Sequence, residues 1–372
     1  MRILQVGKYY CPVVGGMESV IRDLAEGLHL RKVETEVLCA NNSMAHQDSI
    51  VAGVNVSRCS RWGVIAGTAI SPDMIWSLTK RINSYDIVHI HHPNPIATLA
   101  LLLARPQCKV VLHWHSDIVK QKFLLRVYSP LLEWQLKRAD AIVATSPNYA
   151  ETSPYLLANR RKTNIVPIGI NPQRLHINGR LLEKLRTRFQ GKKIVFSLGR
   201  MTYYKGFQFL VEAMKYLPEN VVVLLGGSGE LKDGLGLLSR RLGVMDRVVF
   251  LGHIDDDDLA AYYKLCNVFC LPSIARSEAF GVVLLEAMAH RKPLVTTSIR
   301  GSGMSWINVD GLTGLVAAPE NPMELGSALG RLLDDTAFAD QCGENARARF
   351  DRMFTSDTMV EGIMRIYDDV MN

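Results

Sequence analysis

The chain has 372 residues, of which 48% are hydrophobic and 21% charged, a balance typical of a folded globular protein. This length is too great for one ordinary core and suits two α/β domains of about 150 to 190 residues each. The formal net charge of +7 favours anionic partners, and nucleic acid, nucleotides and anionic lipid all qualify.

The cysteines and the start of the chain indicate the compartment. The chain has seven cysteines, an odd number with no CxxC pair, which favours a reducing compartment. A short apolar strand follows Met1 and Arg2 directly, so we expect no signal peptide. No run reaches the about 18 apolar residues that a membrane-spanning helix needs. We therefore expect a cytoplasmic protein.

Short β-branched runs alternate with helical patterns along the whole chain. Runs such as VVVLL at 221–225 are apolar on both faces, as in a covered parallel sheet. This alternation predicts doubly wound α/β layers. Strands are predicted at 3–7, 36–40, 86–90, 109–114, 141–145, 164–168, 193–198, 221–226, 247–251, 267–271, 293–296 and 314–317.

The alternation breaks once, in the polar and basic stretch 171–193 that contains Pro172 and Gly179. We place the domain junction at its start, which predicts domains at 1–170 and 171–354. Each half then opens with a strand that runs into a functional-looking loop. Two similar domains imply a cleft between the carboxyl ends of two sheets, where open α/β folds bind ligands.

The sequence SEAFGVVLLE at 277–286 places two carboxylates around a glycine that begins an apolar helix. Free backbone N–H groups and the helix dipole make such an N-terminus an anion site. Glu286 lies about 8 Å along the helix from Gly281. A nucleoside diphosphate sugar fits this spacing, with pyrophosphate at the helix start, ribose at Glu286 and sugar hydroxyls at Glu278. An ordinary loop-to-helix junction is the alternative.

Two cations follow the first predicted strand of the second half, in GRMTYYKG at 199–206. Arg200 and Lys205 on one loop can neutralise a departing pyrophosphate, whose charge grows during transfer. A solvated basic loop is the alternative interpretation.

Glycines mark two further loops. Gly15 and Gly16 precede an amphipathic helical pattern, and paired glycines let a backbone approach a ligand closely. GGSGE at 226–230 follows a strand and is similar to a phosphate-binding turn, without the full dinucleotide fingerprint. Either motif can also be a plain turn.

Histidines gather near the ends of two predicted strands, and imidazoles that converge there can bind zinc. Asp117 is the only carboxylate near them at ligand spacing, so we favour polar contact of His115 with a substrate and expect His113 to point the opposite way. The acidic run 255–258 fits a helix N-cap and first turn without a metal ion. The cluster consists of His89, His91, His92, His113 and His115.

The stretch 117–137 mixes basic side chains with aromatic and aliphatic ones. This pattern suits a helix on an anionic membrane surface, and equally a surface helix with a buried apolar face. The basic residues that would contact lipid are Lys120, Lys122, Arg126 and Lys137.

Taken together, these motifs resemble family 4 retaining glycosyltransferases of the GT-B fold, an α/β fold of two Rossmann-like doubly wound domains facing across a cleft. The resemblance covers essentially the whole chain, and the motifs of the second half are the more specific. They are GG at 15–16, HSD at 115–117, GRMTYYKG at 199–206, GGSGE at 226–230, LPS at 271–273, SEAFGVVLLEAMA at 277–289 and DGLTGLV at 310–316.

The resemblance implies a role for each matching position. Gly16 and Gly227 would lie near the donor phosphates, His115 would contact the transferred sugar, and Arg200 and Lys205 would bind the pyrophosphate. Glu278 would hold sugar hydroxyls and Glu286 the ribose, while backbone contacts would come from Phe280, Gly281 and Val282. It also implies that 1–170 binds the acceptor, that 171–354 binds the nucleotide sugar, and that the closing segment 355–372 returns to the first domain.

The family's chemistry implies hexosyl transfer with retained anomeric configuration and no divalent metal or other cofactor. Taken as a whole, the sequence resembles bacterial surface-polysaccharide enzymes of the O-antigen, lipopolysaccharide or capsule type. This resemblance implies GDP-mannose or a UDP-hexose as donor. The acceptor would be a glycan or a polyprenyl-diphosphate-linked glycan at the cytoplasmic face of the inner membrane.

Two competing hypotheses stay open on the sequence. One is a zinc-dependent hydrolase that uses the histidine cluster, including His89, His91, His113 and His115. The other is a non-catalytic nucleotide binder on the same fold. We expect no nucleic-acid partner, because the chain has neither an aromatic-interleaved basic groove nor a helix-turn-helix pattern.

Overall fold

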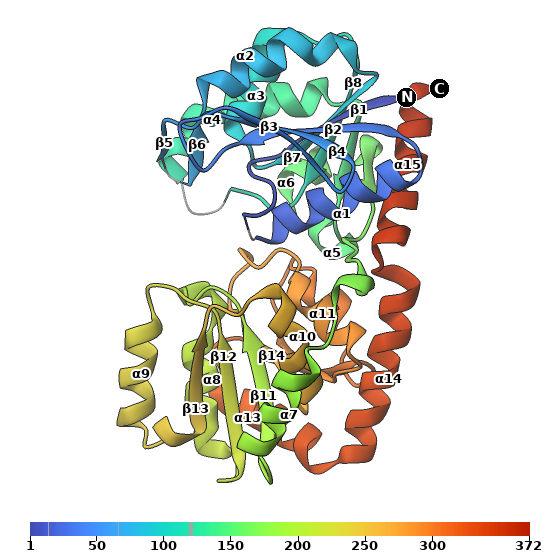
Figure 1. The fold of residues 1–372 in the computed structure, drawn as a ribbon. Coiled ribbons are helices and arrows are strands. Elements are labelled where there is room, and N and C mark those ends of the chain that lie inside the picture. The colour runs from blue at the N-terminus through green and yellow to red at the C-terminus, as the bar shows by residue number, and fades with distance from the viewer. Residues whose placement is uncertain (14, 66, 119–121) are drawn as a thin grey trace. The chain divides into compact units, whose positions relative to one another are not determined.

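The computed structural model describes residues 1–13, 15–65, 67–118 and 122–372, with only the backbone of 122–125. The chain divides into two compact units. The first comprises Met1–Ile170 with Ser356–Asn372, and the second comprises Asn171–Thr355. Helices flank the large sheet of each unit (Figure 1).

The first unit is built on a sheet in the order β10-β9-β8-β7-β1-β2-β4-β3. Its neighbouring strands are parallel except for the antiparallel pair β3 and β4. Two short strands, β5 (Gly63–Ile65) and β6 (Thr68–Ile70), form a separate hairpin. The sheet strands are β1 (Arg2–Val6), β2 (Glu34–Ala40), β3 (Gln47–Val51), β4 (Val54–Cys59), β7 (Ile87–His92), β8 (Lys109–Trp114), β9 (Ala141–Ala144) and β10 (Thr163–Ile165).

The helices of the first unit begin where the sequence provides caps. The side chains of Ser71, Asn94 and Ser146 each accept a hydrogen bond from a backbone N–H of the first turn, and proline follows each of them. The helices are α1 (Gly16–Leu30), α2 (Pro72–Arg81), α3 (Pro95–Ala104), α4 (Lys122–Arg138), α5 (Pro147–Ala150), α6 (Pro154–Ala158) and α15 (Ser356–Met371).

The second unit is built on an entirely parallel sheet in the order β13-β12-β11-β14-β15-β16. Its strand order reverses between β11 and β14, which is where doubly wound sheets bind ligands. The strands are β11 (Lys193–Leu198), β12 (Val221–Gly226), β13 (Val248–Gly252), β14 (Val268–Leu271), β15 (Leu294–Thr297) and β16 (Gly314–Ala317). The helices are α7 (Gly179–Arg188), α8 (Phe207–Ala213), α9 (Lys232–Arg241), α10 (Asp256–Leu265), α11 (Val282–Ala289), α12 (Met304–Ile307), α13 (Pro322–Asp334) and α14 (Thr336–Met353).

The closing helix α15 packs into the first unit through one apolar face. Met359, Ile363 and Tyr367 follow one another at intervals of four residues, and all three are completely buried. The Tyr367 hydroxyl accepts a hydrogen bond from Gln5 on β1. The last residues of the chain are therefore tied to its first strand.

The predicted fold class is confirmed, because both units have parallel sheets with Rossmann-like connections. All twelve predicted strands are present, with shifts of a few residues at their ends. The sequence did not predict β3 and β4, which form the edge of the first sheet, or the short strands β5 and β6. β3 has one exposed face, so it lacks the continuous apolar run of the central strands.

Candidate functional site

Loops from four strands of the second unit converge at the carboxyl edge of its sheet. Backbone hydrogen bonds join the loop after β11 to that after β12, with Gly199 N–H donating to the Gly226 carbonyl at 3.1 Å. The loop after β14 is tied to the β11 loop where Ile274 N–H donates to the Tyr204 carbonyl at 2.8 Å. The loop after β15 joins them through Gly303 N–H and the Ala279 carbonyl at 2.7 Å.

Two glycines permit this close approach. A Cβ at Gly227, where φ is 110°, would lie 2.1 Å from the carbonyl oxygen of Gly199. A Cβ at Gly206, where φ is 70°, would lie 2.0 Å from the carbonyl oxygen of Pro272. These positions need glycine for both space and conformation. Gly227, one of the predicted donor-binding residues, thus sets the spacing between two site loops.

The helix α11 begins at Val282, with Gly281 as its N-cap at φ 91°, as predicted from the sequence. No side chain caps this terminus. Phe280 is 4% exposed and packs edge to face against Phe354. The first N–H groups of α11 are therefore presented without a competing side-chain acceptor, which is the arrangement that suits a bound anion.

Lys205 and Glu278 form a buried ion pair at this edge. Lys205 Nζ lies 2.5 Å from Glu278 Oε2, and the two side chains are only 11% and 10% exposed. Ser273 Oγ donates to the same carboxylate oxygen at 3.0 Å. The Ser302 hydroxyl donates to the Glu278 carbonyl, which holds the backbone. Two predicted site residues from loops 73 positions apart are thus brought into direct contact.

Arg200 stands at the end of β11 and is exposed. It forms no ion pair with any carboxylate within the part of the chain that the structure describes. The neighbouring Met201 N–H donates to the Ser228 carbonyl at 2.8 Å, which places Arg200 beside the β12 loop that contains Gly227. Its guanidinium is available to an anionic ligand.

Glu286 lies one turn into α11, and Tyr263 on α10 fixes its carboxylate. The Tyr263 hydroxyl donates to Glu286 Oε2 at 2.6 Å. Burial, reinforced by the neighbouring carboxylate, raises the pKa of Tyr263 well above its usual value, so the hydroxyl keeps its proton. Tyr263 was not predicted as a site residue, and the sequence offers no signal for it because the contact joins separate helices.

The first unit contains the two other predicted residues, each placed by the elements of that unit alone. Gly16 is exposed at the first turn of α1, which follows β1 at the point where this sheet's strand order reverses. His115 follows β8 and is 9% exposed. Asp117, two residues later, accepts hydrogen bonds from Trp114 Nε1 and Ser153 Oγ, both at 2.8 Å.

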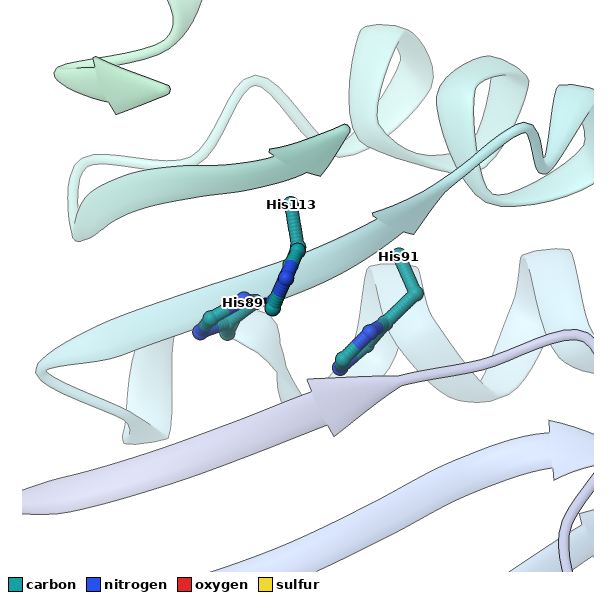
Figure 2. Close-up of side chains that lie close together, drawn as sticks. All are labelled: His89, His91 and His113. Atoms are coloured by element: carbon teal, nitrogen blue, oxygen red, sulfur yellow. Dashed lines mark hydrogen bonds between the residues drawn. The ribbon is translucent and has the colours of Figure 1, made fainter. Parts of the chain in front are cut away.

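Four of the five histidines, on β7, on β8 and just after β8, form one buried cluster, and Figure 2 shows three of them. The four are His89, His91, His113 and His115, whereas the ring of His92 stacks on Trp114. The rings of His113 and His115 stack with centroids 4.4 Å apart. The expectation that His113 points the opposite way is wrong, because residues two apart on a strand share a face. Burial lowers the pKa of both His89 and His115 to about 3. These rings are neutral at ordinary pH.

The cluster could hold a metal only by losing hydrogen bonds. One nitrogen each from His89, His91 and His113 lies within 4.8 Å of the others. Five of their six ring nitrogens already bond to Tyr367, Gln5, His115 or each other. Only His113 Nε2 has no partner within the described residues. This geometry gives the zinc-dependent hydrolase no support.

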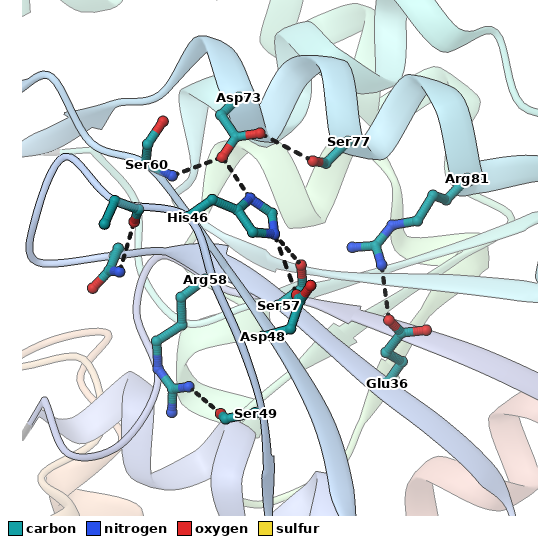
Figure 3. A network of polar contacts seen from close by, with 12 residues as sticks. Glu36, His46, Asp48, Ser49, Ser57, Arg58, Ser60, Asp73, Ser77 and Arg81 are labelled. Carbon is teal, nitrogen blue, oxygen red and sulfur yellow. Dashed lines mark hydrogen bonds and ion pairs between the residues drawn. The ribbon is translucent and has the colours of Figure 1, made fainter.

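A second polar cluster surrounds His46 near the outer edge of the first sheet (Figure 3). His46 Nδ1 lies 2.7 Å from Asp73 Oδ2, and Nε2 lies 3.2 Å from Asp48 Oδ1. The hydrogen bond with Asp73 raises the pKa of His46. Sequence reasoning did not single out this group, since its members come from three separate elements.

The stretch proposed to contact a membrane contains α4 and the residues before it. Lys120 lies outside the described residues, and Arg126 and Val127 are exposed. No helix within the described residues is both long and apolar enough to cross a bilayer. Peripheral membrane association therefore stays a prediction.

Comparison with known proteins gives matches over both units. A family model described as "Glycosyltransferase Family 4" matches residues 14–174. A second, described as "Glycosyl transferases group 1", matches residues 183–349. The two matched segments meet close to the junction between the units.

The chain aligns with two relatives over nearly the full length of both sequences. The chain is 32% identical to an O-antigen chain mannosyltransferase C of Escherichia coli, covering 100% of this chain and 99% of the relative. It is 34% identical to D-rhamnosyltransferase WbpZ of Pseudomonas aeruginosa, covering 96% and 93%.

Solved structures share the fold at lower identity. A sucrose-phosphate synthase from Thermosynechococcus elongatus superimposes with a TM-score of 0.82 at 22% identity, covering 100% of this chain and 99% of that one. Anabaena HepE in complex with UDP-glucose gives a TM-score of 0.80 at 19% identity, covering 99% and 100%.

Proposed function

The chain belongs to the family 4 glycosyltransferases, and we propose that it transfers a hexosyl unit from a nucleotide sugar to a glycan or lipid-linked acceptor. The product would be part of a bacterial surface polysaccharide such as O-antigen. A mannosyl group from GDP-mannose is the donor we favour, with a UDP-hexose as the alternative. The two relatives named above, a mannosyltransferase and a rhamnosyltransferase, support this choice.

The observation that carries the proposal is the buried pair of Lys205 and Glu278 beside the uncapped start of α11. An ammonium group and free backbone N–H groups suit a diphosphate, while a carboxylate suits sugar hydroxyls. Both kinds of group stand within one set of hydrogen-bonded loops. A nucleotide sugar carries both a diphosphate and sugar hydroxyls, so it fits this set of groups.

Each site residue then has a chemical task. Arg200 and Lys205 bind the pyrophosphate, and Glu286 binds the ribose with its carboxylate oriented by Tyr263. Glu278 binds sugar hydroxyls, and His115 contacts the transferred sugar. The remaining contacts to the donor come from the backbone of Gly16, Gly227, Phe280, Gly281 and Val282.

The reaction we propose is a displacement on one face of the sugar, so the anomeric configuration is retained. The bond from the anomeric carbon to the leaving phosphate oxygen breaks as the bond to the acceptor oxygen forms. The acceptor's proton passes to the leaving phosphate. Arg200 and Lys205 stabilise the negative charge that grows there, a task that many transferases assign to a divalent cation. We therefore propose that no metal or other cofactor is needed.

The acceptor we propose is a polyprenyl-diphosphate-linked glycan at an anionic membrane surface. The net charge of +7 and the exposed Arg126 and Val127 on α4 support peripheral attachment. Neutralising Lys120, Lys122 and Arg126 together should reduce binding to anionic vesicles. Unchanged binding would remove the membrane from the proposal.

A thermal-shift panel of GDP-, UDP- and ADP-linked sugars, run in chelator, tests the donor. A ligand that binds only the folded protein stabilises it and so raises the melting temperature. At a ligand concentration one hundred times Kd, the stabilisation is about 2.7 kcal/mol. We expect GDP-mannose to raise the melting temperature. We also expect the rate at which that donor is hydrolysed or its sugar transferred to be the same with and without the chelator. No shift with any of these sugars, in a folded sample, would contradict the proposal.

A further inference from the structure

A continuous line of hydrogen bonds joins the closing helix α15 to His115. The Tyr367 hydroxyl lies 2.9 Å from Gln5 Nε2, and Gln5 Oε1 lies 2.9 Å from His91 Nε2. The other nitrogen of the His91 ring, Nδ1, lies 2.9 Å from His115 Nε2. Residues from β1, β7, the end of β8 and α15 thus meet in one line.

These groups are removed from water. Gln5, His91 and Tyr367 are completely buried, and His115 is 9% exposed. Burial lowers the pKa of His91 well below its usual value and that of His115 to about 3, because an imidazolium would lose its hydration. Each ring is therefore neutral near pH 7 and has one N–H group and one lone pair.

The amide of Gln5 sets the direction in which the protons point. In the amide orientation of this structure, Gln5 Nε2 faces Tyr367 and Oε1 faces His91. Because the oxygen can only accept, His91 has its proton on Nε2 in this arrangement. His91 Nδ1 then has a lone pair, which requires a proton on His115 Nε2. The remaining nitrogen of His115, Nδ1, is left with a lone pair and has no hydrogen-bond partner among the residues described.

A second line of hydrogen bonds starts at the same amide, and its donor and acceptor roles follow from the same orientation of Gln5. Gln5 Nε2 donates to the Tyr367 hydroxyl, which therefore donates its own proton to His89 Nδ1 at 2.6 Å. His89 then donates from Nε2 to His113 Nδ1 at 3.2 Å. This branch ends at His113 Nε2, where an N–H group has no partner within the described residues. One amide orientation thus accounts for every proton in the cluster.

We propose that Gln5, His91 and Tyr367 are positioning residues that hold His115 as the tautomer protonated on Nε2, with a lone pair on Nδ1 for the transferred sugar. The inference rests on the proposed role of His115 at the sugar. A lone pair accepts a hydrogen bond from a sugar hydroxyl and complements the positive charge that develops at the anomeric carbon. An N–H group at the same place would oppose that charge.

The tautomer can be observed directly in the full-length protein with 15N-labelled histidine. Long-range proton–nitrogen correlation spectra distinguish a protonated ring nitrogen from one with a lone pair. The His115 signals are assigned by their loss in a His115→Gln variant. We expect His115 to be protonated on Nε2 alone, and a proton on Nδ1, or a mixture, would overturn the proposal. This measurement needs no substrate, so it stands even if the proposed transfer reaction fails.

Kinetics test whether the line matters for transfer. Gln5→Leu removes both hydrogen bonds of the amide, so we expect both His115 tautomers and a fall in kcat of about tenfold, with donor KM changed less than about twofold. Tyr367→Phe breaks the line at its far end and should give a smaller fall. A Gln5→Leu protein that keeps a single tautomer and its full kcat would overturn the positioning role.

A matched control separates this role from general loss of packing. Tyr85→Phe removes another buried hydroxyl of the first unit, one that donates to Glu36 and lies outside the line. It should leave the His115 tautomer and kcat unchanged. If Gln5→Leu fails to fold, Tyr367→Phe and the wild-type spectra still decide the question, because the tyrosine variant leaves the ring volume in place.

Discussion

The site loops of the second unit and the histidine cluster of the first are held in place by different means. In the second unit, backbone hydrogen bonds and glycines fix the loops, and an ion pair between Lys205 and Glu278 completes them. In the first unit, neutral side chains on neighbouring strands hold one another through ring stacking and hydrogen bonds.

The difference lies in what each arrangement can tolerate. A backbone-built loop keeps its shape when one side chain changes, so a substitution there should affect charge more than geometry. When one member of a buried side-chain network is removed, the donor and acceptor roles of the remaining hydrogen bonds are no longer fixed. Variants in the two regions should therefore fail in different ways.

The largest expected effect comes from Lys205→Ala. Removing one preorganised donor from a leaving group lowers kcat by about 10²–10³-fold. The change also leaves Glu278 buried without its cation, which costs about 3 kcal/mol of stability. Steady-state kinetics and chemical denaturation measure the two losses separately.

A double variant distinguishes these losses. Lys205→Ala with Glu278→Gln should recover most of the stability and none of the activity. Lys193→Ala, which removes an exposed ion pair with Asp334 in the same unit, should change neither. Full turnover by a folded Lys205→Ala protein would show that this lysine does not serve the leaving phosphate.

Gly227→Ala tests whether the close approach of the loops after β11 and β12 requires a glycine. The new Cβ would lie 2.1 Å from the Gly199 carbonyl oxygen at a φ of 110°, so we expect a loss of about 3 kcal/mol in the free energy of unfolding. Gly236→Ala is the control, since it lies in α9 with no heavy atom within 4 Å of the new Cβ. It should stabilise the protein by about 0.5–1 kcal/mol.

Glu286→Ala should mainly weaken donor binding, raising the donor KM about tenfold with little change in kcat, because a ribose contact is the same in ground and transition states. Tyr263→Phe keeps the carboxylate and removes only the hydroxyl that orients it, so a smaller rise is expected. Calorimetric titration with the nucleoside diphosphate checks both. An unchanged affinity in Glu286→Ala would remove this residue from the ribose site.

The smallest expected effect is the change of stability with pH that His46 causes, in contrast to the buried His115, which does not titrate near neutral pH. The hydrogen bond with Asp73 raises the pKa of His46, whereas burial lowers that of His115 to about 3. The charged His46 ring stabilises the folded state fully below its unfolded pKa of about 6.5, and this contribution is lost as pH rises through the folded pKa.

The partners of His46 set the lower limit of this pH window. The Ser57 hydroxyl lowers the pKa of Asp48, and the hydrogen bond from His46 lowers that of Asp73 against the effect of burial. Their contribution is lost as pH falls through those values. The stability difference between wild type and His46→Gln should therefore be about 0.5 kcal/mol near pH 5–6 and vanish near pH 9. A difference that grows toward pH 9 would contradict this assignment.

Much of the second unit could be read from the sequence because its signals are local. The loop cations, the glycines and the start of α11 at Gly281 all lie within short motifs beside apolar strands. The contact between Lys205 and Glu278 could not be read, since it depends on β11 and β14 being neighbours although β12 and β13 lie between them in the chain. Tyr263 stayed hidden because its contact with Glu286 joins two separate helices, α10 and α11.

By itself the sequence determined the α/β class, the twelve predicted strands and the family, because apolar runs and glycine motifs act over a few residues. Only the tertiary structure decided which polar side chains meet. The line from Tyr367 through Gln5 and His91 to His115 joins residues up to 362 positions apart. No local pattern encodes such a line, because strand order and the return of α15 to β1 create it.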